Sequence, residues 1–322
     1  MREPGNGRRR RLAEELEEAG IRLGENPLHR DTLLDEIDHA LRPVVHERRT
    51  ASGGTIVEPM SDPATWGPGT QLEITRTPVG PQPLSAVRRF ADGLSSWVLR
   101  RADGTNEWLL FDRPAGSERD LVVMAGAFDA TLVQRHPAES VRVAGSFGVL
   151  RWQGLWWHHE PPVGRWIDMV AAGPVHGDPQ VLEALLEFAV HDLGATGIGS
   201  LLIYRPGAEP GPEVEELLPT PPPLQIRRPF HLAPLRHALS QIDGAAVFDA
   251  TGILRQLGVR LVPSQDAERS VVAYRGTRHT SGRRYSHDDP LATVIAVSED
   301  GPVTVFRGGG VLGRSDNEVG HE

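Results

Sequence analysis

The 322-residue chain contains no cysteine, no lysine and no long hydrophobic run. Without cysteine there are neither disulfides nor thiolate metal sites, and the chain is compatible with a reducing compartment. Without lysine there is no P-loop lysine, no Schiff base and no lysyl-adenylate intermediate. No segment approaches the roughly 18 apolar residues that a bilayer span needs, and the N-terminus has no apolar signal core. We therefore expect a cytoplasmic protein that does not enter a membrane.

The charge balance limits the partners. The chain has a formal net charge of -9 and 39% hydrophobic residues, which is typical of a soluble globular protein. An acidic surface disfavours non-specific binding to nucleic acid, so no nucleic-acid partner is expected. The length leaves room for two domains, each with its own core.

Composition and periodicity divide the N-terminal half into three parts. Residues 1–50 carry four arginines, Arg8 to Arg11, and then two helical patterns, so we expect a helical leader. Residues 51–83 are rich in glycine and proline, which predicts a linker. Residues 84–173 are expected to form a β-rich domain, because short runs with turn signals between them recur at 96–99, 107–111, 121–124, 141–143 and 149–152.

Aromatic, histidine and acidic residues gather at the end of that β-rich domain: Trp152, Trp156, Trp157, His158, His159 and Glu160. They could bind a ligand, a metal or a partner. Packing is the favoured interpretation, because adjacent histidines on a strand point to opposite faces and aromatics supply much of the buried area of small β domains.

The C-terminal half reads as a domain over 174–308. Asp178-Pro179 is a helix start, and apolar residues recur at helical spacing from Gln180 to Leu193. A strand over 198–204, a proline-rich insertion over 205–229, a helix over 231–241 and several further strands follow. We expect an α/β fold: a C-terminal mixed β-sheet flanked by helices, preceded by a β-rich N-terminal domain with leading helices. Residues 309–322 are glycine-rich and polar, which predicts a disordered tail.

Two short motifs carry the chemistry of this domain. Asp243-Gly244-Ala245 stands at the start of a buried strand, where a carboxylate can hold a divalent cation or receive a proton. The second motif, Gly276-Thr277-Arg278-His279-Thr280-Ser281, is expected to precede a helix of about ten residues that runs through Arg284. A glycine turn, hydroxyls, a guanidinium and an imidazole at a helix N-terminus are typical of a phosphate site.

In this order the two motifs resemble the diadenylate cyclase (DAC) family, which joins two ATP into cyclic di-AMP and releases two pyrophosphates. The resemblance covers residues 178–308 and includes Gly258-Val259-Arg260-Leu261-Val262-Pro263 and Val294 to Glu299. One departure is Thr280, where the family usually has arginine; Arg283 or Arg284 on the next turn could supply that contact. In this family each domain binds one ATP, and two domains face each other as a homodimer.

The resemblance implies a role for each matching position. Asp243 would coordinate Mg²⁺ or Mn²⁺ and help activate the attacking hydroxyl, with Glu299 as a further metal ligand. Arg278 and His279 would act on the phosphates as catalytic residues. The nucleotide-binding positions would be Gly244, Ala245, Leu261, Gly276, Thr277, Thr280, Ser281 and Ser298. The upstream β-rich domain would act as a sensor.

Three functions remain open from the residues. The chain can be a cyclase regulated by its N-terminal part. It can instead be a catalytically weak or inactive DAC-like module that binds ATP or a cyclic dinucleotide as a regulatory ligand. A cyclase that condenses other nucleotides is the third, because main-chain contacts to a base leave little trace in side chains.

Overall fold

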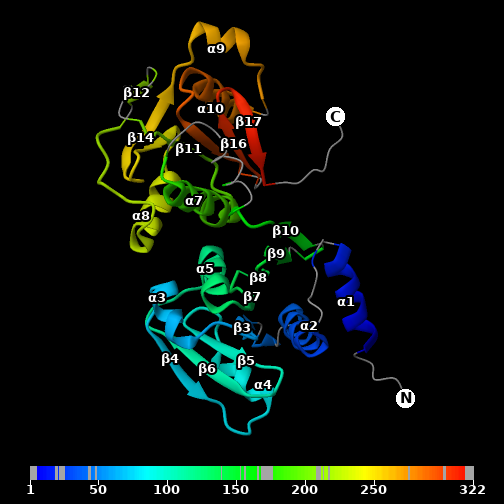
Figure 1. The fold of residues 1–322 in the computed structure, drawn as a ribbon. Helices are drawn as coiled ribbons and strands as arrows, with labels where there is room; N and C mark the ends of the chain where they lie inside the picture. Colours follow the sequence, from blue (N-terminus) through cyan, green and yellow to red (C-terminus); the bar gives the residue numbers. More distant parts are fainter. Residues whose placement is uncertain are drawn as a thin grey trace. The chain divides into compact units, whose positions relative to one another are not determined.

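A computed structural model describes the chain over residues 6–18, 21, 26–42, 45–47, 49–138, 140–152, 154–155, 157–164, 167, 177–207, 212, 214–216, 218–274, 276–299 and 302–315. Two compact units, 1–162 and 163–322, account for the fold, and each is described by itself (Figure 1).

A mixed sheet forms the centre of the first unit. Eight strands of the described residues pair in the order β10-β9-β8-β7-β3-β5-β6-β4. Strand β3 pairs in parallel with β5, and the other pairs are antiparallel. The bounds are β3 (Gly53–Val57), β4 (Ile74–Pro78), β5 (Ser96–Arg100), β6 (Asn106–Phe111), β7 (Thr131–Arg135), β8 (Val141–Gly145), β9 (Gly148–Trp152) and β10 (Trp157–Glu160); a separate ribbon joins β1 (Val45–His46) to β2 (Arg49–Thr50).

Helices cover both faces of this sheet. Side chains alternate along each strand, so Ile56 of β3 packs with one helix layer while its neighbour Val57 packs with the other. One layer contains α1 (Asn6–Glu18) and α2 (Pro27–Leu41). The opposite layer contains η1 (Pro63–Thr65), α3 (Trp66–Thr70) and α5 (Glu118–Phe128), and the short α4 (Leu84–Val87) and η2 (Arg88–Phe90) precede β5.

Residues 51–83 do not form the predicted linker, because they contain β3, η1, α3 and β4. One of the glycines that suggested a linker, Gly54, has a packing role. A Cβ on Gly54 would lie 2.7 Å from Cζ3 of the buried Trp97 and 2.6 Å from Gly93 Cα, so only glycine fits this central strand.

The run Leu121–Met124, expected as a strand, lies in helix α5. A capping box begins this helix: Ser117 Oγ accepts from the Asp120 backbone N–H at 3.1 Å, and Asp120 accepts from the Ser117 N–H at 3.0 Å. A short apolar run is compatible with either a strand or a helix, and the capping box is the sequence signal that favours the helix here.

The arginine run of the expected leader is part of helix α1. Arg8 Nε lies 2.6 Å from Asp38 Oδ1 and Arg9 Nη2 lies 2.7 Å from Asp35 Oδ1, so these arginines tie α1 to α2. In the aromatic cluster, the Trp152 and Trp157 rings pack 5.3 Å apart, and His159 Nε2 lies 2.8 Å from the Phe147 carbonyl. Trp156 lies outside the described residues.

The second unit has a mixed sheet of its own. Seven strands among the described residues pair in the order β12-β14-β13-β11-β15-β16-β17, and only the β11–β13 pair of these is parallel. The bounds are β11 (Ser200–Tyr204), β12 (Val214–Glu216), β13 (Ala245–Phe248), β14 (Leu254–Leu261), β15 (Thr293–Val297), β16 (Val303–Arg307) and β17 (Gly310–Arg314).

Helices again cover both faces. On one face α7 (Pro179–Glu187), the π-helical turn η3 (Phe188–Leu193) and α8 (Pro229–Leu239) pack on the sheet through Leu185, Phe188 and Leu235, and η4 (Gly194–Thr196) leads into β11. On the other face α10 (Gly276–Asp288) packs through Tyr285, preceded by α9 (Gln265–Ser270). The predicted α/β class is confirmed: along the chain, a β-rich unit with leading helices precedes a mixed sheet that is flanked by helices.

The predicted disordered tail is wrong over 310–314, which form strand β17. Gly308 and Gly309 both have positive φ, +57° and +77°, which makes the tight turn of a β16–β17 hairpin. Ser315 then closes the hairpin, because its N–H donates to the Val303 carbonyl and its Oγ accepts from the Val303 N–H. Residues 316–322 lie outside the described residues.

Across the described ranges, every helix is too short or too polar to cross a bilayer.

Candidate nucleotide site

The sheet of the second unit brings the predicted residues to one edge. Strands β11 and β13 are parallel, with Leu201 opposite Ala245, so both strands begin at this edge. Strand β15 runs antiparallel to β11, with Val297 opposite Ser200, and therefore ends there. Asp243 precedes β13 and Glu299 follows β15, and both side chains line one cleft of about 400 Å³.

Three more segments complete this cleft. The turn Gly197 to Gly199 enters β11, residues 239–242 end helix α8, and Arg278 comes from the first turn of α10. The Arg278 Nη2 atom lies 3.7 Å from Glu299 Oε1, and both side chains retain solvent exposure, 32% and 73%. This ion pair is long and solvent-exposed, so the Arg278 guanidinium keeps hydrogen-bonding capacity for a ligand anion.

Asp243 is exposed and makes no hydrogen bond or ion pair with any of the described residues. Its carboxylate therefore faces the cleft without a protein partner. Two carboxylate side chains and one guanidinium in a polar cleft are a donor set suited to a hard divalent cation together with a phosphate. No cluster of three or more candidate metal ligands occurs among the described residues, so substrate oxygens would have to complete a metal's coordination.

Glycines let the backbone segments of this edge approach closely. Gly244 has φ +106°, and a Cβ there would lie 2.7 Å from the Gly258 carbonyl carbon, so the second residue of the Asp-Gly-Ala motif must be glycine. Gly199 was not singled out from the sequence. A Cβ on it would lie 2.8 Å from Glu299 Cγ and 2.9 Å from Arg278 Cζ, so the Arg278–Glu299 pair sits directly on this glycine.

Leu261 lies at the same edge but does not line the cleft. Ala245 is opposite Val259 in the antiparallel β13–β14 pair, which places Leu261 level with Asp243. The sheet order β14-β13-β11-β15 then spreads Leu261, Asp243, Gly199 and Glu299 along the edge at about 4.8 Å per strand.

The start of helix α10 holds the other predicted phosphate ligands. Gly276 and Thr277 are exposed in its first turn, where N–H groups without helical partners attract anions. His279 is buried, its ring 6.0 Å from that of Tyr274 and 6.1 Å from that of Phe306. It is not part of the cleft lining. Ser281 and Ser298 are half-buried beside Arg278 and Glu299 in sequence, and they too stay outside the lining.

Thr280 is engaged with the backbone. Its Oγ1 accepts from the Tyr274 N–H at 3.0 Å and lies 2.8 Å from the Tyr274 carbonyl and 2.9 Å from the Gly276 carbonyl. Arg283 does not take the place of the family arginine, because its Nε donates to the Gly309 carbonyl at 2.7 Å and its Nη1 to the Val272 carbonyl at 3.3 Å.

Known families match both units. The profile of the DAC family, described as "DisA bacterial checkpoint controller nucleotide-binding", matches residues 189–311. The second unit is a DAC domain. The family described as "Probable sensor domain DACNK" matches residues 10–160, so this chain joins a DACNK domain to a DAC domain. The expected resemblance, including the upstream sensor-like domain, is thereby confirmed, and the second unit belongs to a nucleotide-binding family.

Other comparisons add little. No curated protein matches the chain. A solved structure described as a hypothetical membrane spanning protein from Bacillus cereus aligns at 20% identity with a TM-score of 0.29. The alignment covers 39% of this chain and 59% of that one, so the DAC-containing chain spans less than two thirds of that structure.

Proposed function

We propose that the DAC domain condenses two ATP into cyclic di-AMP and releases two pyrophosphates. The observation that carries the proposal is the meeting of Asp243, Arg278 and Glu299, three residues far apart in sequence, in one polar cleft. In each of two equivalent steps the 3′-oxygen of one ATP forms a bond to the α-phosphorus of the other. The bond from that phosphorus to the bridging oxygen breaks, and pyrophosphate leaves.

Asp243 is the residue that acts on the nucleophile in this proposal. Its exposed carboxylate is the group that can take the 3′-hydroxyl proton as the new P–O bond forms. Asp243 and Glu299 would also hold Mg²⁺ or Mn²⁺, which supplies neutralisation of the phosphate charge.

Arg278 and the first turn of α10 bind the phosphates in this scheme. Arg278 is held loosely by Glu299, so a phosphate oxygen can compete for its guanidinium. Gly276 and Thr277 would offer backbone N–H groups, and Ser281 and Ser298, which lie outside the cleft lining, would add hydroxyls. His279 has a structural role in this scheme. Its buried ring packs against Tyr274 and Phe306 and so fixes the first turn of α10.

The base would lie toward Leu261, with the backbone of Gly244 and Ala245 beside the sugar. Leu261 and Glu299 stand three strand spacings apart on the sheet edge, or about 14 Å. An extended nucleotide can therefore reach from an apolar contact at one end to Arg278 at the other. One cleft with one such arginine suits one ATP, so two DAC domains would face each other in a homodimer.

A second function has one observation in its favour. Thr280 stands where the DAC family usually has arginine, and its hydroxyl is bonded to the backbone rather than directed at a ligand. A domain short of one phosphate contact would bind ATP or a cyclic dinucleotide as a regulatory ligand and turn it over slowly or not at all.

Mass spectrometry of the products separates the two functions. The full chain is incubated with ATP and either Mg²⁺ or Mn²⁺, and in a parallel reaction with all four nucleoside triphosphates. Cyclic di-AMP is expected from the unmodified chain, and Asp243→Asn is expected to lower its rate at least about 100-fold, since general-base effects are of that order. Asp266→Asn, in the exposed first turn of α9, is the matched control and should keep the rate.

Absence of any cyclic product, with ATP or cyclic di-AMP still bound in a calorimeter, would replace the cyclase by the regulatory binding module. A cyclic product from another nucleotide would keep the chemistry and change the substrate.

A further inference from the structure

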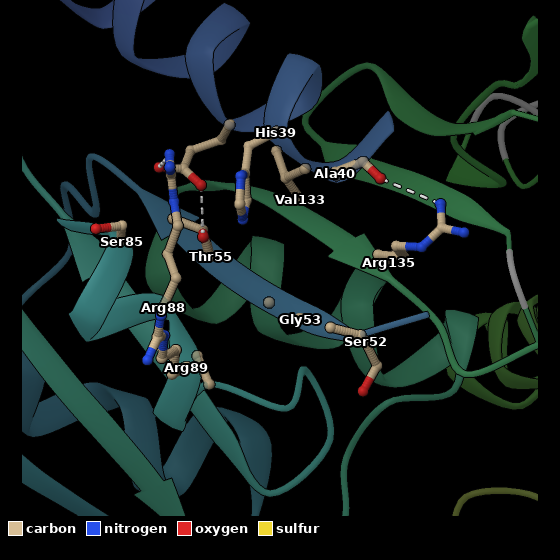
Figure 2. Close-up of a pocket in the computed structure, with 14 residues that line it drawn as sticks. His39, Ala40, Ser52, Gly53, Thr55, Ser85, Arg88, Arg89, Val133 and Arg135 are labelled. Atoms are coloured by element: carbon tan, nitrogen blue, oxygen red, sulfur yellow. Dashed lines mark hydrogen bonds and ion pairs between the residues drawn. The ribbon is translucent and has the colours of Figure 1, made fainter. Parts of the chain in front are cut away.

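The DACNK domain contains a cavity of about 620 Å³ that the proposed cyclase chemistry does not use. Helix α2 lies over it, strands β3 and β7 line it from the sheet, and the α4–η2 segment closes one side (Figure 2). A volume of this size is many times the ~30 Å³ share of one water and lies within the usual range of small-molecule pockets.

The charged lining of this cavity is mainly positive. Three guanidinium side chains, Arg88, Arg89 and Arg135, line it against one carboxylate, Glu36. That carboxylate is already matched by the wall: Glu36 Oε1 accepts from Arg88 Nη2 at 2.7 Å and from Arg100, and Oε2 accepts from Thr55 Oγ1 at 2.9 Å. Arg88 and Arg100 thus match the charge of Glu36 and its neighbour Asp35, and Arg89 adds a positive charge to the lining.

The side chains around Glu36 are held in place by ion pairs before any ligand binds. Arg88 and Arg100 each contact both Asp35 and Glu36. Burial alone would raise the pKa of Asp35, but the hydrogen bond from Arg100 and the charge of Arg88 outweigh it and hold that pKa below 3.8. Contacts with both carboxylates keep Arg88 in place, and Arg135 Nη1 donates to the Ala40 carbonyl at 3.2 Å (Figure 2).

Arg89 differs from its neighbour. Its side chain is exposed and makes no hydrogen bond or ion pair with the residues that the structure describes, although it lines the same cavity. A ligand anion can therefore bind the Arg89 guanidinium without breaking one of the ion pairs that hold the other lining residues.

The remaining lining suits the body of an organic molecule. Ala40, Ala91 and Val133 give apolar contacts, and Gly53 leaves strand β3 without a side chain there. His39 points toward the cavity from α2 (Figure 2). Burial, and then the charge of Arg88, lower the pKa of His39 below 6.5, so near neutral pH its ring offers one donor and one acceptor.

We propose that this cavity binds a small organic anion, a carboxylate or phosphate ester with an apolar body, through Arg89. Its occupancy is the input that the DACNK domain passes to the DAC domain. This second statement rests on the proposed function, whereas the binding itself does not.

The test uses the full chain and two pairs of probes that differ in charge alone. Benzoate is compared with benzamide, and phenyl phosphate with phenol; none is a nucleotide, so the DAC cleft is not the intended site. The anions are expected to raise Tm by about 2–4 °C at concentrations several-fold above Kd. Their neutral partners should not. The benzoate and phenyl phosphate arms show which anion the cavity prefers.

Two variants assign that binding to the cavity. Arg89→Ala should raise the Kd of the anion at least about tenfold, the usual effect of removing a charged hydrogen-bond donor, with partial recovery in Arg89→Lys. Arg11→Ala removes the same charge from an exposed side chain of α1 outside the lining and should leave Kd unchanged. Ala51→Trp, at an exposed position of the lining, should block binding of both anions.

Equal binding of the neutral probes, an unchanged Kd in Arg89→Ala, or no shift with either anion would each overturn the anion site. Cyclic di-AMP production that is unaffected by saturating anion would overturn the regulatory statement and leave the cyclase intact. Anion binding that depends on Arg89, in a chain that makes no cyclic product, would keep the binding site and reject the cyclase.

Discussion

The two domains hold their charged groups in opposite ways. In the DACNK domain, Glu36 is 2% exposed and shares its oxygens among Arg88, Arg100 and Thr55. In the DAC domain, Glu299 is 73% exposed and has one loose contact, 3.7 Å to Arg278. The first arrangement fixes the wall of a cavity before any ligand arrives. The second leaves charges weakly paired, as the proposed binding of a cation and of phosphates requires.

Replacing each glutamate by glutamine tests this contrast most strongly. Glu36→Gln leaves two guanidinium groups partly uncompensated inside the DACNK domain and is expected to lower the free energy of unfolding by about 3 kcal/mol. Glu299→Gln should change it by no more than about 0.5 kcal/mol, because its ion pair is exposed. Urea denaturation of the full chain measures both; similar losses for the two variants would remove the distinction.

The backbone of the DAC cleft is expected to be rigid although its side chains are not. Gly244→Ala would force a Cβ against Gly258 at φ +106°, and we expect a loss of about 2–3 kcal/mol of stability. Gly276→Ala is the matched control, since φ is +80° but a Cβ there meets nothing within 4 Å; about 1 kcal/mol of backbone strain is expected. If both variants lost the same free energy of unfolding in urea denaturation, the close approach of Gly244 to Gly258 would not contribute to the cost of the substitution.

These sites were not equally readable from the sequence. Asp243-Gly244-Ala245 and Arg278-His279 are contiguous motifs, so they could be found without a fold. Gly199 could not, because its importance arises only when β11 lies beside β15 and α10 reaches over both. The cavity of the DACNK domain likewise has no local motif: its lining is drawn from four segments between residues 36 and 135.

The fold shows the same limit. Strand β13, which follows the Asp-Gly-Ala motif, was predicted well because its apolar run is short and lies between turn signals. Segment 51–83 was misread as a linker because composition cannot show that Gly54 faces Trp97 on the neighbouring strand. Helix α5 was wrongly predicted as a strand, because four consecutive apolar residues fit both the helical and the strand period. The Ser117–Asp120 capping box was nevertheless visible in the sequence.

A smaller effect is expected at the start of α10. Thr280→Ala removes the hydroxyl that ties Tyr274 and Gly276 to the helix and should cost about 1 kcal/mol, whereas Thr280→Ser should keep most of the stability. The neighbouring Thr277 is exposed and makes no hydrogen bond to a described residue, so Thr277→Ala should leave stability unchanged while weakening ATP binding. Denaturation and calorimetry with ATP separate the two. If Thr280→Ala weakened ATP binding without destabilising the chain, Thr280 would be a ligand contact after all.

The smallest effect concerns pH and the DACNK domain. Burial and Arg88, then Arg100, lower the pKa of His39, while Glu36 and Asp35 act in the opposite direction without reversing it. The folded chain therefore resists protonation of His39 more than the unfolded chain does. Stability from this group is complete above pH 6.5 and is lost as pH falls from there through the folded pKa.

His39→Gln should therefore reduce the loss of unfolding free energy between about pH 7 and about pH 5.5. Part of that loss remains, because burial and the charge of Arg142 also lower the pKa of His136. His237→Gln, at an exposed position of α8 in the DAC domain, is the control and should leave the pH dependence as it was. If His39→Gln and His237→Gln gave the same pH dependence, the imidazole on the cavity would not be coupled to folding. A bound anion that removes the loss in the unmodified chain, and does so less in Arg89→Ala, would link the titration of His39 to occupancy of the cavity.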